Sequence, residues 1–328
     1  MTLVEMPPVA ESSLGGRFRL DERISLDDQV GGPCGSSWEA RGLSLWKATD
    51  RLLTRPVAVY LLPRGPVPRA VAEAVRSAAR VADPRLATIY DTDFGAERPY
   101  VVAEWASGTH LEDLLLSGLP NPALAAAMIA DAADAIAVAH RARCAHLRLT
   151  PRALRWDPST GLKITGLGLD AALCGAAGPG TAGPGALLAP GGRPPEPPGI
   201  VNPVAADTTA LARMLYALLT GYWPGDEPTA LPAAPRYKGR VCTPRQVRAG
   251  VPAILDAIAY RGLHGQAADA PLRAQTPAGL AMALRTVQRP SYQLPRPEEA
   301  APVRATRPHP RHARPRFGHR TTLLRPAV

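Results

Sequence analysis

Lysine is scarce in this sequence, although its net charge is positive. Only Lys47, Lys163 and Lys238 occur among 328 residues, so arginine supplies nearly all of the 38 basic side chains. Glycine and proline are abundant, at 29 and 37 residues, and together with the many alanines they are typical of a GC-rich coding sequence. Clusters of arginine therefore say less about function here than they would in an average protein.

Cysteine is scarce as well, and the thiols are far apart in the sequence. The four residues are Cys34, Cys144, Cys174 and Cys242, and no two of them form a Cys-x-x-Cys pair. This spacing argues against a zinc site and against a disulfide framework, and it fits a reducing cytoplasm.

Long apolar runs and a secretory leader are also lacking. The first residues, MTLVEMPPVAESS, contain neither a basic n-region nor an apolar h-region. No uncharged apolar run reaches about 18 residues, the length that a membrane span needs. We therefore expect a cytoplasmic protein with no membrane span.

The positive charge is concentrated at the C-terminal end. The formal net charge is +10, and residues 289–328 supply +7 of it through nine Arg and two Glu. The rest of the chain is nearly neutral. Hydrophobic residues make up 46% of the chain and charged residues 20%, which excludes a wholly disordered or fibrous protein. The sequence thus predicts a folded body followed by an Arg/Pro-rich disordered tail.

Strand patterns come first along the chain, and helical patterns follow. Strands are predicted at 17–24, 44–50, 56–63, 86–94 and 98–105, with one helix at 67–82. Further helices are predicted at 121–142, 207–220, 251–263 and 276–287, with two short strands at 153–157 and 162–166. A β-rich part followed by an α-rich part is α+β in character.

Six stretches of the sequence resemble a bacterial Ser/Thr protein kinase domain, in the family's order and spacing. They are RPVAVYLL, ARVADPRLATIYD, RPYVVAEWASGTHLEDLL, AHRARCAHLRLTPRALRW, LKITGLGLD and DTTALARMLYALLTGYWP. In the family these stretches are the strand with the ATP-binding Lys, the segment after helix αC, the hinge, the catalytic loop, the metal-binding turn and helix αF. One match alone is weak, but six in order are specific.

The resemblance implies a bilobal fold over residues 17–288, after a flexible N-terminus at 1–16. Its parts are a small β-rich N-lobe at 17–103, a hinge at 104–108 and a larger α-helical C-lobe at 109–288. Residues 175–205 contain eight Gly and eight Pro, too many for regular structure. They are expected to form a flexible loop in the place of the activation segment.

The groups that hold ATP phosphates in the family are replaced in this chain. Catalysis of phosphoryl transfer depends on positioned charges. The strand Lys position is Tyr60, and its helix αC partner position is Ala74, with Glu73 one residue away on another face of the helix. A phenol is neutral at pH 7 and does not replace an ammonium group.

The catalytic loop and the metal-binding turn are altered in the same way. The family pattern HRDxKxxxN reads His146-Leu-Arg-Leu-Thr-Pro-Arg-Ala153, so Arg148 stands at the catalytic Asp, Thr150 at the Lys and Ala153 at the Asn. The first residue of the DFG triplet is Gly166. Because Mg²⁺ binds oxygen ligands, we expect no metal site and no catalytic residue.

Residues with structural roles in the family are retained. The resemblance implies that His146 packs in the core, that Asp207 binds the backbone of the catalytic loop, and that Glu196 pairs with Arg273. For Asp207 the sequence leaves open a second interpretation, a helix N-cap before Thr208 and Thr209. For Glu196 and Arg273 the alternative is two solvated surface charges.

A remnant of a nucleotide pocket is also predicted. Ala58 matches the small residue above the adenine ring, and the hinge residues Glu104, Trp105 and Ala106 offer backbone hydrogen-bonding groups. ATP bound without Mg²⁺ is one interpretation. We favour the other, a collapsed cleft filled by Tyr60 and without a cofactor.

Thr181 and the tail suggest two ways of contacting partners. Thr181 in the Gly/Pro loop is a candidate phosphorylation site, and a phosphate there would recruit a phospho-threonine-binding protein. The tail carries one aromatic residue, Phe317, between Arg307 and Arg325, which does not support a nucleic-acid platform. Weak, salt-dependent contact with anionic lipid head groups or with acidic partners is the remaining interpretation, and contact with lipid would place the protein at the inner membrane face.

We therefore expect a pseudokinase, a catalytically inactive kinase-like scaffold or regulatory module. It resembles the degenerate kinase domains that actinobacteria carry in signalling and cell-envelope proteins, and cell-envelope proteins are the partners that this resemblance implies. The alternative from another class is an unconventional or weak ATP-dependent Ser/Thr kinase, and the third is an anionic-surface binder that uses the tail.

Overall fold

The computed structural model describes residues 13–25, 42–174, 202–264 and 275–287. The chain divides into two units, residues 1–294 and 295–328. All the described residues belong to the first unit, and the predicted tail lies outside them.

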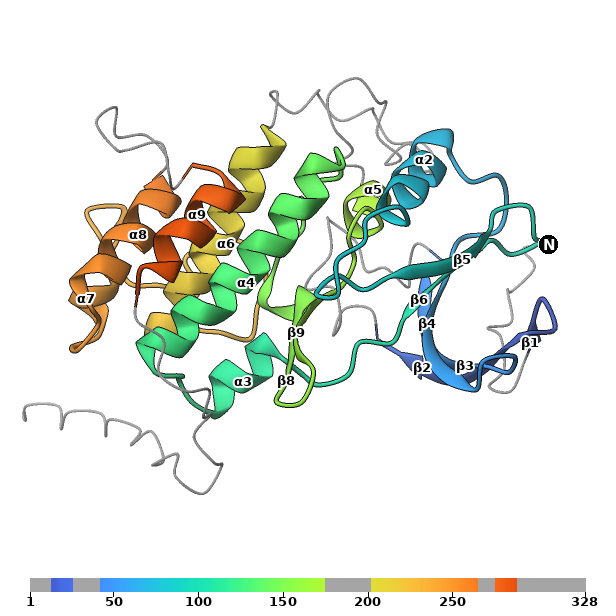
Figure 1. Ribbon diagram of the computed structural model, residues 1–328, viewed down its shortest axis with the longest axis horizontal. Coiled ribbons are helices and arrows are strands. Elements are labelled where there is room, and N and C mark those ends of the chain that lie inside the picture. The colour runs from blue at the N-terminus through green and yellow to red at the C-terminus, as the bar shows by residue number, and fades with distance from the viewer. Residues whose placement is uncertain (1–12, 26–41, 175–201, 265–274, 288–328) are drawn as a thin grey trace, which may run out of the picture. The chain divides into compact units, whose positions relative to one another are not determined.

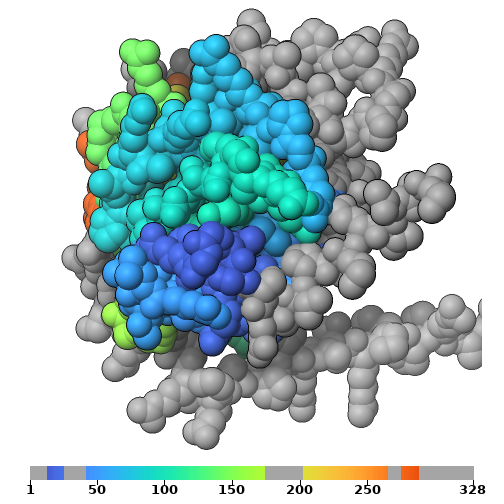
Figure 2. Space-filling model, turned by 90° about the vertical axis from the view of Figure 1, so that its right-hand side faces the viewer, coloured from blue at the N-terminus to red at the C-terminus, as the bar shows by residue number. Residues whose placement is uncertain are grey.

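A six-stranded antiparallel sheet forms the N-terminal lobe (Figure 1). The strand order is β1-β2-β3-β4-β6-β5. The strands are β1 Ser13–Leu14, β2 Phe18–Ile24, β3 Ser44–Asp50, β4 Arg55–Leu61, β5 Ile89–Asp93 and β6 Tyr100–Glu104. The five longer strands overlap the five strands that the sequence predicts in this part of the chain. Figure 2 shows the outer side of this lobe, with the residues of β2 in dark blue and those around β5 in teal.

Strand β4 has both faces buried, and its two faces pack in different clusters. Val57 and Val59 pack in a cluster with Phe18 of β2. Ala58 and Tyr60 point the other way, into the cluster that contains the helix of this lobe. The period-2 geometry of a strand thus places Tyr60 on the face that borders the second lobe.

Helix α2 covers that face of the sheet. It runs over Arg69–Ala78, shorter at both ends than the predicted 67–82. Its apolar stripe contains Val71 and Val75, which pack with Tyr60. The helix therefore lies where the family places helix αC.

Four helices form the core of the C-terminal lobe (Figure 1). They are α4 Pro122–Arg141, α6 Pro203–Thr220, α8 Ala253–His264 and α9 Pro277–Arg285. Helix α4 begins at a capped end, where the Asn121 side chain accepts a hydrogen bond from the Leu124 N–H at 2.8 Å. Within the described ranges, α4 is long and apolar enough to cross a membrane, and 72% of that window is buried inside the fold.

Helix α6 corrects two predictions. It begins at Pro203, four residues before the predicted start, so residues 203–205 belong to the helix and not to the Gly/Pro loop. The N-cap is Asn202, whose side chain accepts from the Val204 N–H at 3.0 Å. Asp207 is therefore an interior residue of the helix, and its interpretation as an N-cap is wrong.

Short elements connect the two lobes. They are β7 Thr109–His110, α3 Leu111–Ser117, a 3-10 turn at Pro151–Ala153, β8 Leu154–Asp157, β9 Gly161–Ile164 and α5 Asp170–Cys174. The Ala87 N–H donates to the Ile164 carbonyl at 2.7 Å, and Lys163 pairs with Glu104 at 2.6 Å. These contacts join the end of β9 to the strands of the N-terminal lobe.

The predicted α+β arrangement of a small β-rich lobe and a larger helical lobe is confirmed. Three elements between α6 and α8 were not predicted: the strands β10 Arg236–Tyr237 and β11 Arg240–Val241, and the short helix α7 Pro244–Val247. Strands of two residues are too short for a periodic pattern to reveal.

Candidate functional site

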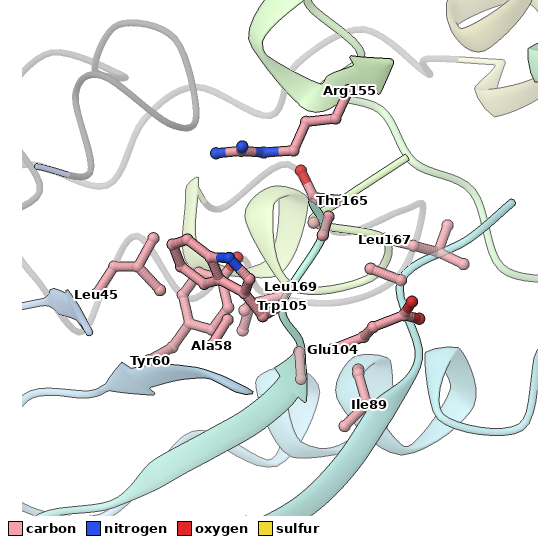
Figure 3. A pocket seen from close by; sticks show the side chains of 14 residues that line it. Leu45, Ala58, Tyr60, Ile89, Glu104, Trp105, Arg155, Thr165, Leu167 and Leu169 are labelled. Carbon is pink, nitrogen blue, oxygen red and sulfur yellow. The ribbon is translucent and has the colours of Figure 1, made fainter. Parts of the chain in front are cut away.

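A small cavity lies between the two lobes (Figure 3). It has a volume of about 30 Å³, whereas pockets that hold small ligands are roughly 300–1,000 Å³. Its lining includes Ala58, Tyr60, Glu104, Trp105, Ala106, Arg155, Thr165, Gly166, Leu167 and Leu169. All four residues of the predicted pocket remnant are thus brought together here. The cavity that they line is much smaller than a nucleotide.

The phenol of Tyr60 fills part of this space. The side chain is buried, at 7% exposure, and burial, followed by the nearby Asp170 carboxylate, raises the pKa of the phenol. Tyr60 therefore stays neutral, and the position where the family has a cation carries none. Glu73 does not approach it, because its side chain is exposed and pairs with Arg69 at 2.6 Å.

The carboxylate of Asp170 lies in the space beside Gly166. A Cβ built on Gly166 would overlap the Asp170 carboxylate. Gly166 has a φ of +82°, and the Asp170 N–H donates to the Gly166 carbonyl at 3.0 Å. This turn folds α5 back, so that the side chain of Asp170 occupies the space into which a side chain at position 166 would project.

Asp170 is almost completely buried, at 3% exposure. Burial raises the pKa of its carboxyl to about 7, and the positive charge of Arg148 acts in the opposite direction. No motif in the sequence assigns a role to this residue. Its only signal was a carboxylate that closely follows the altered DFG triplet.

Gly168 lets the same turn pack tightly against α2. A Cβ at this position would lie 2.6 Å from the Ala78 Cβ and 2.9 Å from the Ala74 carbonyl oxygen. Ala74 stands at the family's Glu position. It packs against Gly168 through its backbone carbonyl and supplies no charge to the cleft. After this turn, Leu169 and Leu173 enter the cluster that contains Tyr60, so α5 closes the cleft from the side of α2.

The segment at the position of the family's catalytic loop carries different side chains. Thr150 is buried at 3% exposure, and its hydroxyl has no hydrogen-bond partner within the described ranges. Ala153 is buried at 1% exposure, and its carbonyl accepts from the Thr165 N–H at 2.9 Å. Arg148, at the catalytic Asp position, is close enough to Asp170 to lower the pKa of that carboxyl. Across the part of the chain that the structure describes, no group of three or more His, Cys, Asp or Glu residues is arranged to hold a metal ion.

Asp207 holds the backbone of this loop. Its carboxylate accepts from the His146 N–H at 2.8 Å and from the Leu147 N–H at 2.6 Å. It also accepts from His140 Nε2 at 2.7 Å. Leu147 has a φ of +61°, which is costly for a residue with a side chain. These are the contacts that the resemblance implies for Asp207.

His146 is a fully buried residue whose ring is hydrogen-bonded. Its Nε2 donates to the Thr165 carbonyl at 2.7 Å, and its Nδ1 accepts a long bond from the Arg148 N–H at 3.4 Å. Burial lowers the pKa of the ring. A neutral ring held by hydrogen bonds at both nitrogens fits the packing role that the resemblance implies for His146.

Arg155 is a second cleft residue to which no sequence motif assigns a role. Figure 3 shows its guanidinium extending into the cleft above Trp105 and Thr165. Its Nη1 donates to the Gly108 carbonyl at 2.9 Å and its Nη2 to His110 Nε2 at 2.8 Å. The side chain is 9% exposed, so a cation is held on the wall of a cleft that is also lined by Glu104, Thr165 and several apolar side chains. A charged residue between the buried Leu154 and Trp156 was the signal for it.

A larger cavity of about 380 Å³ lies on the other side of the catalytic loop. Residues 147–150 and one face of α6 line it, with Arg213 and Glu227, which pair at 2.5 Å, at its edge. Asn202, where the described chain resumes, also lines it.

Some predicted residues lie outside the described part of the chain. These are the candidate phosphorylation site Thr181, both partners of the predicted Glu196–Arg273 pair, and the tail.

Comparison with known proteins agrees with this architecture. No protein-family model matches the chain. The serine/threonine-protein kinase PknB of Mycolicibacterium smegmatis is 28% identical over 230 residues, which are 66% of this chain and 36% of PknB. The chain thus spans about a third of the length of this curated relative.

A solved structure shows the same fold. The kinase domain of Mycobacterium tuberculosis PknI superimposes with a TM-score of 0.58 and 15% sequence identity, over 86% of this chain and 99% of that domain. At this identity the match speaks for the fold alone. The chain therefore has a protein-kinase-like fold, as its sequence predicts.

Proposed function

We propose that this chain is a pseudokinase, a kinase-like module that transfers no phosphate and acts by binding protein partners. The observation that carries the proposal is the occupied cleft. Tyr60, Leu169 and Arg155 line a cavity of about 30 Å³ where the fold would hold a nucleotide. The remaining space is too small for an adenine ring unless these side chains move.

Electrostatics supports the same proposal. Phosphoryl transfer requires a base for the acceptor hydroxyl and oxygen ligands for the metal ion. The base position is occupied by Arg148, and the ligand positions by Ala153 and Gly166. Since several groups are replaced together, a single neighbouring residue does not restore the set.

One observation favours a second candidate function, a weak ATP-dependent kinase. The carboxylate of Asp170 lies in the space beside Gly166, so one oxygen ligand is present near the place where the family has one. On this alternative, α5 would supply the ligand that the turn lacks. Charge repulsion would also keep the carboxylate apart from phosphates unless a cation lay between them.

Thermal unfolding with nucleotide separates the two candidates. For the full chain with millimolar ATP, with and without Mg²⁺, we expect no change in melting temperature. We also expect no transfer of labelled γ-phosphate to the chain or to casein. A Mg²⁺-dependent increase in melting temperature, together with label transfer that Asp170→Asn abolishes and the exposed control Asp226→Asn does not, would establish the weak kinase and overturn the pseudokinase.

In this pseudokinase the tail at 289–328 and the Gly/Pro loop at 175–205 would bind partners. Phosphorylation of Thr181 by another kinase would create a site for a phospho-threonine-binding protein. A role in cell-envelope control follows only from the resemblance to actinobacterial proteins. Deleting residues 289–328 and measuring retention on anionic vesicles at low salt tests the tail, and unchanged retention removes it as a membrane contact.

A further inference from the structure

The hairpin β10–β11 carries a lysine in an unfavourable backbone conformation. Its turn residues are Lys238, with a φ of +48°, and Gly239, with a φ of +78°. Two-residue hairpin turns with both φ values positive favour Asn-Gly or Gly-Gly, because a longer side chain is strained there. The hairpin therefore holds a cationic side chain at its tip at a conformational cost.

This segment of the chain is exposed and positively charged. Residues 235–240 are all exposed, and Tyr237 has 69% of its surface accessible. Between Glu227 and Asp256 the sequence contains five Lys or Arg residues and no Asp or Glu. Arg248 points inward, since its Nη1 donates to the Leu219 carbonyl at 3.1 Å. The hairpin itself presents three of the five cations.

The end of α8 lies within electrostatic range of the hairpin. Tyr260 is 36% exposed, and its ring contacts that of His264, with centroids 4.5 Å apart. Burial, and after it the charge of Arg240 on the hairpin, lowers the pKa of His264. Arg240 therefore lies within electrostatic range of α8. We call the joint area the hairpin surface and define it as Arg236, Tyr237, Lys238, Arg240, Tyr260 and His264.

The hairpin also offers open backbone edges. Its ladder pairs Arg236 with Val241 and Tyr237 with Arg240. The two strands form a sheet of their own, to which no other described strand is hydrogen-bonded. The outer edge of a strand presents N–H and C=O groups that an added extended chain pairs with.

From these features we infer that the hairpin surface binds an extended acidic segment of a partner protein. Carboxylates of the segment pair with Lys238 and Arg240, its backbone adds to the hairpin edge, and its side chains pack on Tyr237. The inference goes beyond the proposed function, because it does not depend on whether the cleft uses ATP.

A polypeptide fits this surface better than a membrane or a nucleic acid does. Asp226 is 96% exposed and lies 3.6 Å from Arg236, so a carboxylate borders the cations. A continuous polyanion would be repelled at this border, whereas a short segment ends before it. Only a polypeptide makes use of the free strand edges.

Fluorescence anisotropy tests the inference with the full chain. The probe is a labelled ten-residue peptide of alternating Glu and Thr, measured at ~150 mM salt, where long-range attraction is screened. Lys238→Glu with Arg240→Glu should weaken binding about tenfold through charge reversal. Tyr237→Ser, which changes no charge, should weaken it about threefold through lost aromatic contact.

A matched control reverses two charges elsewhere. Arg80→Glu with Arg141→Glu changes the net charge equally at exposed positions, so any binding through the tail or through net charge alone falls equally in both double variants. A peptide of the same sequence that is N-methylated at every residue keeps its charge but loses its backbone donors. It should bind about tenfold more weakly.

The outcomes separate clearly. Selective loss in the hairpin double variant, together with weaker binding of the N-methylated peptide, supports the inference. Equal loss in both double variants, or no loss in either, overturns it. Unchanged peptide binding with selective loss of retention on phosphatidylserine vesicles or single-stranded DNA also overturns it, and assigns the surface to that polyanion. Circular dichroism confirms that each variant is folded, as expected for exposed positions.

Discussion

The carboxylate of Asp170 occupies the space into which a side chain on Gly166 would project. The glycine and the carboxylate therefore depend on each other. With a larger residue at 166, the turn could not bring α5 back against α2. Without Asp170, the turn would leave an empty space beside Tyr60. The two glycines of the altered triplet Gly166-Leu-Gly168 thus allow the close packing of α5 that closes the cleft.

Asp170 predicts a specific dependence of stability on pH. Its pKa is about 7 in the folded protein and near 4 in an unfolded chain, so the folded state binds this proton more tightly. The stabilisation from this group is complete below pH ~4 and is lost as pH rises to ~7. The side chain of the Asp170→Asn variant carries no charge at any pH. Its free energy of unfolding should therefore exceed that of the wild type by on the order of 2–4 kcal/mol at pH 8 and by much less at pH 5.

Urea unfolding at several pH values measures this difference. Asp226→Asn serves as the control, since Asp226 is 96% exposed, and it should follow the wild type across the range. A difference between Asp170→Asn and the wild type that stays constant from pH 5 to pH 8 would contradict the buried, protonated carboxyl.

Restoring the family's residue at the turn should harm the fold. Gly166→Asp places a side chain against the Asp170 carboxylate and forces a non-glycine residue to a φ of +82°. The backbone strain alone costs roughly 1–2 kcal/mol, and the overlap adds to it. We expect a loss of at least ~2 kcal/mol in the free energy of unfolding.

A double-mutant cycle identifies the cause. Asp170→Ala in the Gly166→Asp background removes the overlap and should recover a large part of the loss, giving a favourable coupling energy of about 1–3 kcal/mol. Additive effects of the two substitutions would show that the two positions do not compete for the same space.

Asp207→Ala should be among the most damaging single changes in the C-terminal lobe. It removes the acceptor of two backbone N–H groups and of the His140 ring, and it releases Leu147 from its left-handed conformation. Buried donors left without an acceptor cost about 1–3 kcal/mol each, so a total of roughly 3–5 kcal/mol is expected. Chemical denaturation measures it, and a cost near that of the exposed control Asp226→Ala would contradict the anchoring role.

Arg155 should control the titration of His110. Burial, and after it the charge of Arg155, lowers the pKa of the His110 ring to about 4. Arg155→Leu removes the charge, so the pKa should rise but stay below the usual value for histidine, because the burial remains. Arg155→Lys keeps a cation and should leave the pKa low. Ring resonances followed by NMR titration give the values, and equal values in the two variants would show that the charge has no part in the shift.

Much of the fold was predictable because its elements bury one face in a regular period. The strand predicted at 44–50 matches β3, and the Ala-rich pattern at 121–142 matches α4 within one residue at each end. The start of α6 was missed because Pro203 at a first helical turn looks the same in sequence as the prolines of the preceding loop.

Residues of the candidate site were predictable only where they lie within sequence segments that match the family in register. The replaced positions Tyr60, Arg148 and Gly166 were found by register within recognised segments. Asp170 and Arg155 were missed, because their positions depend on a turn that folds back and on which face of a short strand borders the cleft. Such fits arise from packing between segments far apart in sequence, and no local periodicity encodes them.

The close packing at Gly168 and Gly166 also limits the mutational paths open to this protein. A return to a metal-binding turn would require an acidic residue at 166, the removal of the carboxylate at 170, and a new position for α5 relative to the backbone of α2. Gly166→Asp alone lowers stability through the overlap with Asp170 and the positive φ, so the carboxylate at 170 would have to be lost first. The order of these changes is therefore restricted, because an acidic side chain at 166 has room only after Asp170 has been replaced.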